Sequence, residues 1–327
     1  MRKRGLVYSI VVAATLFTCT LAVSPAVEAA YPDKPIRLIV PFPAGGNADI
    51  VARSISNELS KNLGQPVVIE NRGGAGGVIG SEVVAKAPAD GYTIMMVSAS
   101  HVINPSMQKS LPYDTIKDFA GISLVAEVPT VLIVHPSVQA KSLKELIALA
   151  KANPGKINFA SAGNGTVGHL SGELLKSMAK IKMEHVAYKG NGPAMTDLLG
   201  GHVQMLFGSM PSALPHIKSG AVRALVVTAP KRSAAAPDIP STTEAGLPGF
   251  DVSTGFGLFA PAKTPRPVIS KLHDEVVKAL KLPEVRDRLA GQGAEPVGST
   301  PEEYDAFVRT ESAKWAKVCK EAGIQPK

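Results

Sequence analysis

Two loops rich in small residues are the segments of this chain best suited to chemistry. The first, residues 41–49, reads PFPAGGNAD, and the second, residues 161–168, reads SAGNGTVG. Each follows an apolar run that predicts a buried strand and precedes a helical pattern, so several backbone N–H groups and the positive end of a helix dipole point out of it. Small side chains let an anion approach those amides closely. Neither loop contains Lys or Arg, so the sequence predicts that backbone donors bind an anion here.

Each loop also has a purely structural interpretation. A single loop of this kind is equally compatible with a tight turn, and Asp49 and Thr166 are candidate caps for the helices that follow. Two such loops are more specific, because ligands of open α/β sheets bind at the carboxyl ends of the strands, where both loops lie. Facing each other, they would clamp an anion. Lys189 is a candidate cationic partner, although a solvated or interlobe position is the simpler expectation.

The second loop also matches a dinucleotide-binding pattern. Gly163, Gly165 and Gly168 have the G-x-G-x-x-G spacing, and Glu184 follows after about 20 residues, where an acid would bind the ribose. A single match of this kind is weak evidence. The N-terminal signal pattern directs the chain out of the cytoplasm, and nicotinamide cofactors are not freely supplied there. We therefore expect no cofactor and keep a dinucleotide-binding protein as the lesser alternative.

A secreted hydrolase that acts on a carboxylate ester is the other alternative. Ser161, His169 and Asp49 include the residue types of a hydrolytic triad. The chain has no G-x-S-x-G nucleophile elbow, and Ser161 stands in an anion-binding loop, where hydrogen bonding is its more natural role. We therefore predict a binding protein and not an enzyme.

The first 30 residues have the pattern of a secretory signal peptide. Basic residues 2–4 precede the apolar run 6–23, Pro25 breaks the helix, and small residues mark a cleavage site after Ala29 or Ala30. A membrane anchor is the alternative for an apolar run of this length, but the Pro break and the lack of a basic flank after it favour cleavage. The sequence therefore predicts a periplasmic protein.

Composition excludes several other classes. The chain has 327 residues, of which 45% are hydrophobic and 19% charged, an ordinary balance for a globular protein of about two domains. The formal charge of +8 is spread along the chain without a Lys/Arg run, and aromatic residues make up only 5%, so we expect no nucleic-acid binding. No His/Cys cluster has zinc-ligand spacing, and we expect no metal site.

Short β-branched runs alternate with helical patterns along the rest of the chain, which predicts α/β domains with largely parallel sheets. Two blocks of such units indicate two lobes. The expected strands are 36–40, 67–69, 93–97, 131–134, 157–160, 184–187, 204–207 and 224–227. After the run 255–260 the rest of the chain is expected to be helical. The expected helices are 51–63, 81–86, 143–151 capped by Ser142, one beginning at 169, 267–280, 284–290 and 301–322.

Several motifs in collinear order from Tyr31 to the C-terminus resemble one bacterial family. They are PFPAGGNADIVAR at 41–53, ENRGGAGG at 70–77, APADGY at 87–92, SAGNG at 161–165 with His169, YKG at 188–190 and AMTDLL at 194–199. The chain resembles the substrate-binding proteins of tripartite tricarboxylate transporters, also called Bordetella uptake gene receptors.

This resemblance implies a two-lobed periplasmic binding protein fold, type II-like, with crossing hinge strands. One lobe would combine 31–128 with 255–327, the other would hold 129–254, and the lobes would close about Val128 and Ser253. The resemblance also implies a monomeric receptor that delivers a small carboxylate to the large and small membrane subunits of a permease.

The resemblance further implies that backbone amides and waters of the two loops hold the ligand. The sequence departs from the family at Asn47 and Ala48, where Ser or Thr commonly provides a hydroxyl, and it does not distinguish a di- or tricarboxylate from an acidic amino acid or an aromatic acid. The implied ligand-binding residues are Phe42, Ala44, Gly45, Gly46, Asn47, Ala48 and Asp49 in the first loop, Ser161, Ala162, Gly163, Gly165, Thr166 and His169 in the second, and Ser98, Ser100 and Ser209 elsewhere in the cleft.

Overall fold

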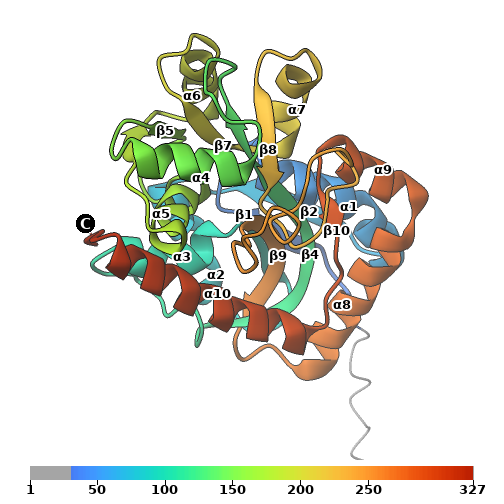
Figure 1. The fold of residues 1–327 in the computed structure, drawn as a ribbon. Helices are drawn as coiled ribbons and strands as arrows, with labels where there is room; N and C mark the ends of the chain where they lie inside the picture. Colours follow the sequence, from blue (N-terminus) through green and yellow to red (C-terminus); the bar gives the residue numbers. More distant parts are fainter. Residues whose placement is uncertain (1–30, 327) are drawn as a thin grey trace, which may run out of the picture.

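The computed structural model describes residues 31–326, which form an α/β structure around a mixed sheet (Figure 1). The predicted signal peptide lies outside these residues. The strands are β1 (Ile36–Val40), β2 (Val67–Asn71), β3 (Thr93–Val97), β4 (Phe119–Val134), β5 (Asn158–Ser161), β6 (Glu184–Ala187), β7 (Met205–Ser209), β8 (Arg223–Val227), β9 (Ser253–Pro261) and β10 (Glu295–Pro296). The helices are α1 (Asn47–Leu63), the 3-10 turn η1 (Ala75–Gly77), α2 (Val78–Ala85), α3 (Ser100–Met107), α4 (Leu143–Ala152), α5 (Val167–Ala179), α6 (Asn191–Leu199), α7 (Met210–Lys218), α8 (Arg266–Lys281), α9 (Pro283–Gly291) and α10 (Pro301–Glu321).

The sheet is parallel toward its two edges and antiparallel in its middle. Its strand order is β2-β1-β3-β9-β4-β7-β5-β6, with β8 and β10 also paired to β4. β1 runs parallel to β2 and β3, and β5 runs parallel to β6 and β7. β9 and β4 run antiparallel to their neighbours. The prediction of a largely parallel sheet therefore holds for the outer strands of each lobe but not for the strands that join the lobes.

The long strand β4 connects the two lobes. Residues 119–129 pair with β9, whereas residues 130–134 pair with β7 and β8. At the change of partners, Pro129 lies opposite Ser253, the first residue of β9. The Thr228 side chain donates to the Thr130 carbonyl at 2.9 Å and is also hydrogen-bonded to the Val252 carbonyl. The predicted crossing strands are thus present, close to the positions at which the sequence places the hinge.

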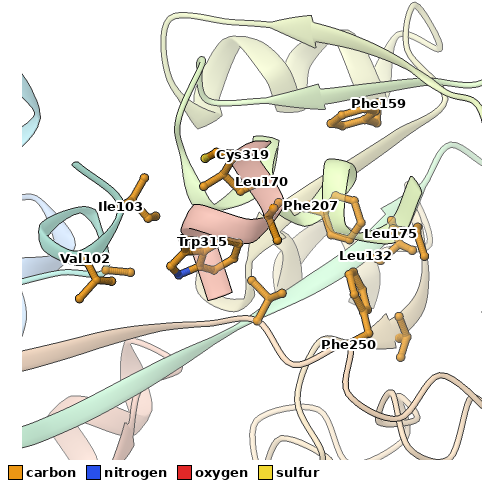
Figure 2. Packing of buried hydrophobic residues seen from close by; sticks show 14 of the residues in the cluster. Val102, Ile103, Leu132, Phe159, Leu170, Leu175, Phe207, Phe250, Trp315 and Cys319 are labelled. Atoms are coloured by element: carbon orange, nitrogen blue, oxygen red, sulfur yellow. The ribbon is translucent and has the colours of Figure 1, made fainter. Parts of the chain in front are cut away.

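Helix α10 packs against both lobes. Its start carries a capping box between Thr300 and Glu303, and Figure 1 shows it running beneath α3 and α5. Farther along, Trp315 is fully buried and shares one apolar cluster with Leu170 of α5 and Ile103 of α3 (Figure 2). The core is therefore continuous between the lobes on this side of the molecule.

Most of the predicted elements are present, with shifted ends. Ser142 caps α4 by accepting a hydrogen bond from the Glu145 N–H, as predicted. Helix α1 begins at Asn47, earlier than its apolar periodicity indicates, because Gly46 is already the extended N-cap residue. Helix α3 was not predicted, since it is short and contains Pro105. Its existence matters because it forms a wall of the candidate site.

Candidate ligand-binding cleft

A cleft of about 590 Å³ lies where helix starts from both lobes meet. One wall is α3 with the two serines at its start, and the facing wall is the second loop. Phe42 of the first loop and the glycine-rich turn η1 form the rest of the cleft lining. The lining residues are Phe42, Ala75, Gly76, Ser98, Ser100, Ile103, Asn104, Met107, Gln108, Asn164, Gly165, Thr166 and Val167.

The α3 wall is polar at its start and apolar along its face. The hydroxyl oxygens of Ser98 and Ser100 are 3.0 Å apart, and the Asn104 side-chain amide donates to the Gly76 carbonyl at 3.1 Å. This bond fastens α3 to η1, where Gly76 has φ +67°, a left-handed conformation that favours glycine. Ile103 and Met107 supply the apolar part of the wall.

The second loop uses some of its N–H groups internally and leaves others free. The Gly163 N–H donates to the Ser161 hydroxyl at 3.1 Å, and the Gly165 N–H donates to His169 Nδ1, also at 3.1 Å. Thr166 caps α5 by accepting from the His169 N–H. Within residues 31–326, the N–H groups of Asn164, Val167 and Gly168 have no hydrogen-bond acceptor. The positive end of α5 therefore presents free donors at the cleft wall.

The first loop also leaves backbone N–H groups without an acceptor among the described residues, at the start of α1. Its N-cap, Gly46, makes no side-chain capping bond, and the N–H groups of Asn47, Ala48 and Asp49 find no acceptor in the described part of the chain. The buried Asp49 carboxylate accepts hydrogen bonds from the Gly45 N–H at 2.9 Å and from Arg53 Nε at 2.8 Å.

Asp49 stays ionised despite its burial. Burial alone would raise its pKa, but the hydrogen bonds from Arg53, from the Gly45 N–H and from Asn71 lower it below the usual value. Because these partners occupy the carboxylate, Asp49 acts as a clamp that shapes the first loop. Asp49 therefore has a structural role, as the sequence indicated. It is not the predicted cap of α1, however, because Gly46 is the N-cap and Asp49 is the third helical residue.

The structure brings together part of the predicted site. Phe42, Ser98, Ser100, Gly165 and Thr166 line the cleft. Eleven predicted residues do not line it in this conformation, and ligand contact by them stays a prediction. They are the exposed or half-exposed Ala44, Gly45, Gly46, Asn47, Ala162, Gly163 and Ser209, and the buried Ala48, Asp49, Ser161 and His169.

Sequence reasoning missed most of the α3 wall and the η1 turn. The glycine run 73–77 was a signal for η1, since it resembles the two loops in composition. The α3 residues had no such signal, because the helix itself was not predicted. The missed lining residues are Ala75, Gly76, Ile103, Asn104, Met107, Gln108, Asn164 and Val167.

Charged side chains are absent from the lining residues. None of the described residues that line the cleft is Lys, Arg, Asp, Glu or His. Lys189 is exposed and does not line the cleft. Among residues 31–326, no group of His, Cys, Asp and Glu side chains could hold a metal ion, and none of the helices is long and apolar enough to cross a membrane.

The geometry disfavours both alternative interpretations. Ser161 is fully buried and pairs with His185 rather than with His169, and Asp49 belongs to the other lobe's loop. Glu184 stands at the start of β6, opposite Asn158, whereas the second loop follows the far end of β5. At about 3.3 Å per residue, the acid is roughly 10 Å from the strand end where a ribose would bind.

Comparisons with known proteins agree with this geometry. The family model described as the tripartite tricarboxylate transporter family receptor matches residues 51–324. Protein BugT of Bordetella pertussis is 40% identical over 315 residues, covering 95% of this chain and 97% of BugT.

Two solved structures share the fold. The periplasmic binding protein BugD is 38% identical with a TM-score of 0.74, covering 91% of this chain and 100% of BugD. A Rhodopseudomonas palustris protein solved with adipate is 35% identical with a TM-score of 0.77, also covering 91% of this chain and 100% of its own. These relatives are solute-binding proteins and not enzymes, so the chain belongs to the tripartite tricarboxylate transporter receptor family and has its two-lobed periplasmic binding protein fold.

Proposed function

We propose that this protein binds a small carboxylate in the cleft and delivers it to a membrane permease with a large and a small subunit. The observation that carries the proposal is the start of α5. There Asn164 and Val167, whose N–H groups have no acceptor within residues 31–326, line a cleft whose described walls hold no ionisable side chain. Free amides at a positive helix end favour an anion.

The rest of the cleft suits the body of an organic acid. The hydroxyls of Ser98 and Ser100 can donate to a carboxylate or to a bridging water, while Ile103 and Met107 offer apolar contact to carbon atoms. A relative with 35% identity was solved with adipate, which supports a carboxylate as the solute class. Dicarboxylates, tricarboxylates, acidic amino acids and aromatic acids all remain candidates for this chain.

We further propose where and how the receptor works. The signal pattern at residues 1–30 directs the mature chain to the periplasm. One lobe combines residues 31–128 with 255–327, and the other holds residues 129–254. The two lobes close on the solute, and the receptor works as a monomer. The change of strand partners at Pro129 and Ser253 supports this division.

Thermal shift followed by calorimetry tests the proposal with adipate, malate, citrate, glutamate and benzoate. Adipamide and benzamide are matched neutral controls. An acid at 100 times its dissociation constant should add about 2.7 kcal/mol to the unfolding free energy, which raises Tm by roughly 4–5 °C for a chain of this length. Binding of none of the five acids, or equal binding of acids and their amides, would contradict a carboxylate receptor.

A further inference from the structure

Two stacked histidines lie behind the second loop. His169 of α5 is 7% exposed, and its ring centroid lies 4.0 Å from that of His185 on β6, with the two planes 19° apart. The His185 ring also stacks on Phe159 of β5 at 4.9 Å. Neither histidine lines the cleft in this conformation, whereas both are hydrogen-bonded to residues of the second loop.

The hydrogen bonds of the pair go to the loop. The Gly165 N–H donates to His169 Nδ1 at 3.1 Å, so Nδ1 carries no proton and the neutral ring carries its proton on Nε2. His185 Nε2 lies 2.7 Å from the Ser161 hydroxyl, which in turn donates to the Gly163 carbonyl at 3.0 Å. The loop is thus linked to an imidazole at two places, at Gly163 through the Ser161 hydroxyl and at Gly165 directly.

The loop needs such ties because its glycines constrain it little. Gly163 has φ +140° and Gly165 has φ +73°, conformations that glycine adopts freely but also leaves freely. The Thr166 N–H and hydroxyl both donate to the Gly163 carbonyl, but the Gly165 N–H has only His169 Nδ1 as its acceptor among the described residues. Without that nitrogen the turn before α5 would lose one of the contacts that fix its direction. The free donors of Asn164 and Val167 depend on that direction.

The surroundings keep both rings neutral. Burial lowers the pKa of His169 to about 4, and burial together with the charge of a protonated His169 lowers that of His185 to about 4. The charged groups facing the pair are Glu173 and Lys176, both on α5. Glu173 lies 3.9 Å from His169 Nε2 but is already paired with Lys176 at 2.8 Å. From β5, the pair meets the uncharged Phe159 and Ser161.

We propose that His169 and His185 are positioning residues that, as a neutral stacked pair, hold residues 161–166 so that the amide donors at the start of α5 stay free for the solute. This inference rests on the proposed function of the cleft. It assigns the histidines no contact with the solute, and it makes the Nδ1 acceptor of His169 the atom on which the loop depends.

Three substitutions separate this role from general packing. His169→Asn keeps a hydrogen-bond acceptor near the position of Nδ1, whereas His169→Leu keeps apolar bulk and removes the acceptor. His101→Leu is the control at another buried histidine, since His101 packs among Tyr113, Phe119 and Phe259 and its ring nitrogens make no hydrogen bond to the loop or to any other described residue.

The first measurement needs no solute. Hydrogen exchange of the Gly165 amide should be slow in the wild type, about tenfold faster or more in His169→Leu, slow again in His169→Asn and unchanged in His101→Leu. Nitrogen-15 spectra of the imidazoles at pH 7 should show His169 protonated on Nε2. A Gly165 amide that exchanges at the wild-type rate in His169→Leu, or a His169 protonated on Nδ1, would overturn the inference.

The second measurement links the pair to binding. The affinity for adipate, malate, citrate, glutamate and benzoate should fall about tenfold or more in His169→Leu for each acid that the wild type binds, and His169→Asn should recover it. Equal affinities of the wild type and His169→Leu would overturn the link. If the wild type binds none of the five acids, the proposed function fails, while the Gly165 exchange still decides the positioning role. If His169→Leu does not fold, His169→Asn and the imidazole spectra decide it.

Discussion

At the scale of the residue, the binding mechanism that we propose depends on backbone atoms more than on side chains. The donors at the cleft wall are N–H groups that remain free because the caps and turns of the second loop use its other groups. A carboxylate bound there gains charge-assisted hydrogen bonds without meeting a cation. Mutations that change a side chain therefore test the mechanism less directly than one that removes an N–H.

Val167→Pro removes one donor with little other change. Val167 is the first helical residue of α5, a position at which Pro is well tolerated, and the preceding Thr166 is extended at ψ 159°, as a residue before Pro should be. Loss of one charge-assisted hydrogen bond should cost about 1.5–3 kcal/mol of binding free energy, or about 10- to 150-fold in affinity by calorimetry.

Two controls accompany this substitution. Val167→Ala shortens the side chain but keeps the N–H, and should cost much less than Val167→Pro. Lys189→Ala removes an exposed cation outside the cleft lining, and should cost less than about tenfold. Normal binding by Val167→Pro together with loss of binding in Lys189→Ala would mean that a salt bridge, and not the amides, holds the solute.

At the scale of the element, α10 ties the two lobes together. Its Trp315 is fully buried between α3 and α5, and near its end Glu321 accepts a hydrogen bond from Ser177 of α5 at 2.6 Å. A helix that packs on both lobes limits how far they separate on that side. We therefore expect any opening of the cleft to bend about the strands β4 and β9 while α10 keeps its contacts.

Trp315→Ala should weaken the whole fold and not only one lobe. Removing a buried Trp side chain leaves a cavity and costs about 3–5 kcal/mol of unfolding free energy, measured by denaturant titration. Val68→Ala, at a 46% exposed position on the edge strand β2, should stay within about 0.5 kcal/mol of the wild type. Similar losses for the two variants would show that α10 contributes little to stability.

At the scale of the whole molecule, two buried histidines, His101 and His169, and the half-buried His185 make the fold sensitive to acid. Burial lowers the pKa of His101, His169 and His185 from 6.5 to about 4. Between these values the unfolded chain binds protons that the folded protein does not, so the unfolding free energy decreases as the pH falls from about 6.5 to about 4. Tm measured at constant ionic strength should fall through this window.

The Glu70 carboxylate titrates in a different window and serves as the reference. The hydrogen bond from Arg37 outweighs burial and lowers the pKa of Glu70 from 4.5 to about 2, so its contribution is lost only as the pH falls from about 4.5 to about 2. The double variant His101→Phe with His169→Asn should reduce the fall of Tm between pH 6.5 and 4.5. A Tm that is flat or rises on acidification over that range would contradict the assignment of neutral buried histidines.

Solute binding should also change the shape of the molecule. The strands change partners at Pro129 and Ser253, which gives the lobes a short two-stranded connection about which to close, as hinge proteins do. X-ray scattering with saturating adipate should show a smaller radius of gyration than the free protein. A profile identical to that of the free protein, at a concentration where calorimetry shows saturation, would contradict closure on binding.

The amino-acid sequence alone was enough to predict the family, the alternation of strands and helices and the two small-residue loops. These are local properties, because apolar periodicity, glycine positions and helix caps act within a few residues of one another. Ser142 and Thr166 cap their helices as their types and positions predict, and Gly64 ends α1 with φ +69°. The composition of the loops likewise predicted a site that relies on backbone donors.

Which backbone donors of the described residues are free, and which cleft walls face them, depends on how distant parts of the chain pack together. Ser161 and His169 were candidate ligand contacts, yet the fold buries both and turns them to the loop's own amides. His185 joins them because β6 lies beside β5 in parallel register. The α3 wall comes from a Pro-containing helix without a local signal, held in place by Trp315 and the rest of the apolar cluster. Contacts between residues so distant in the chain depend on packing, which no local pattern encodes.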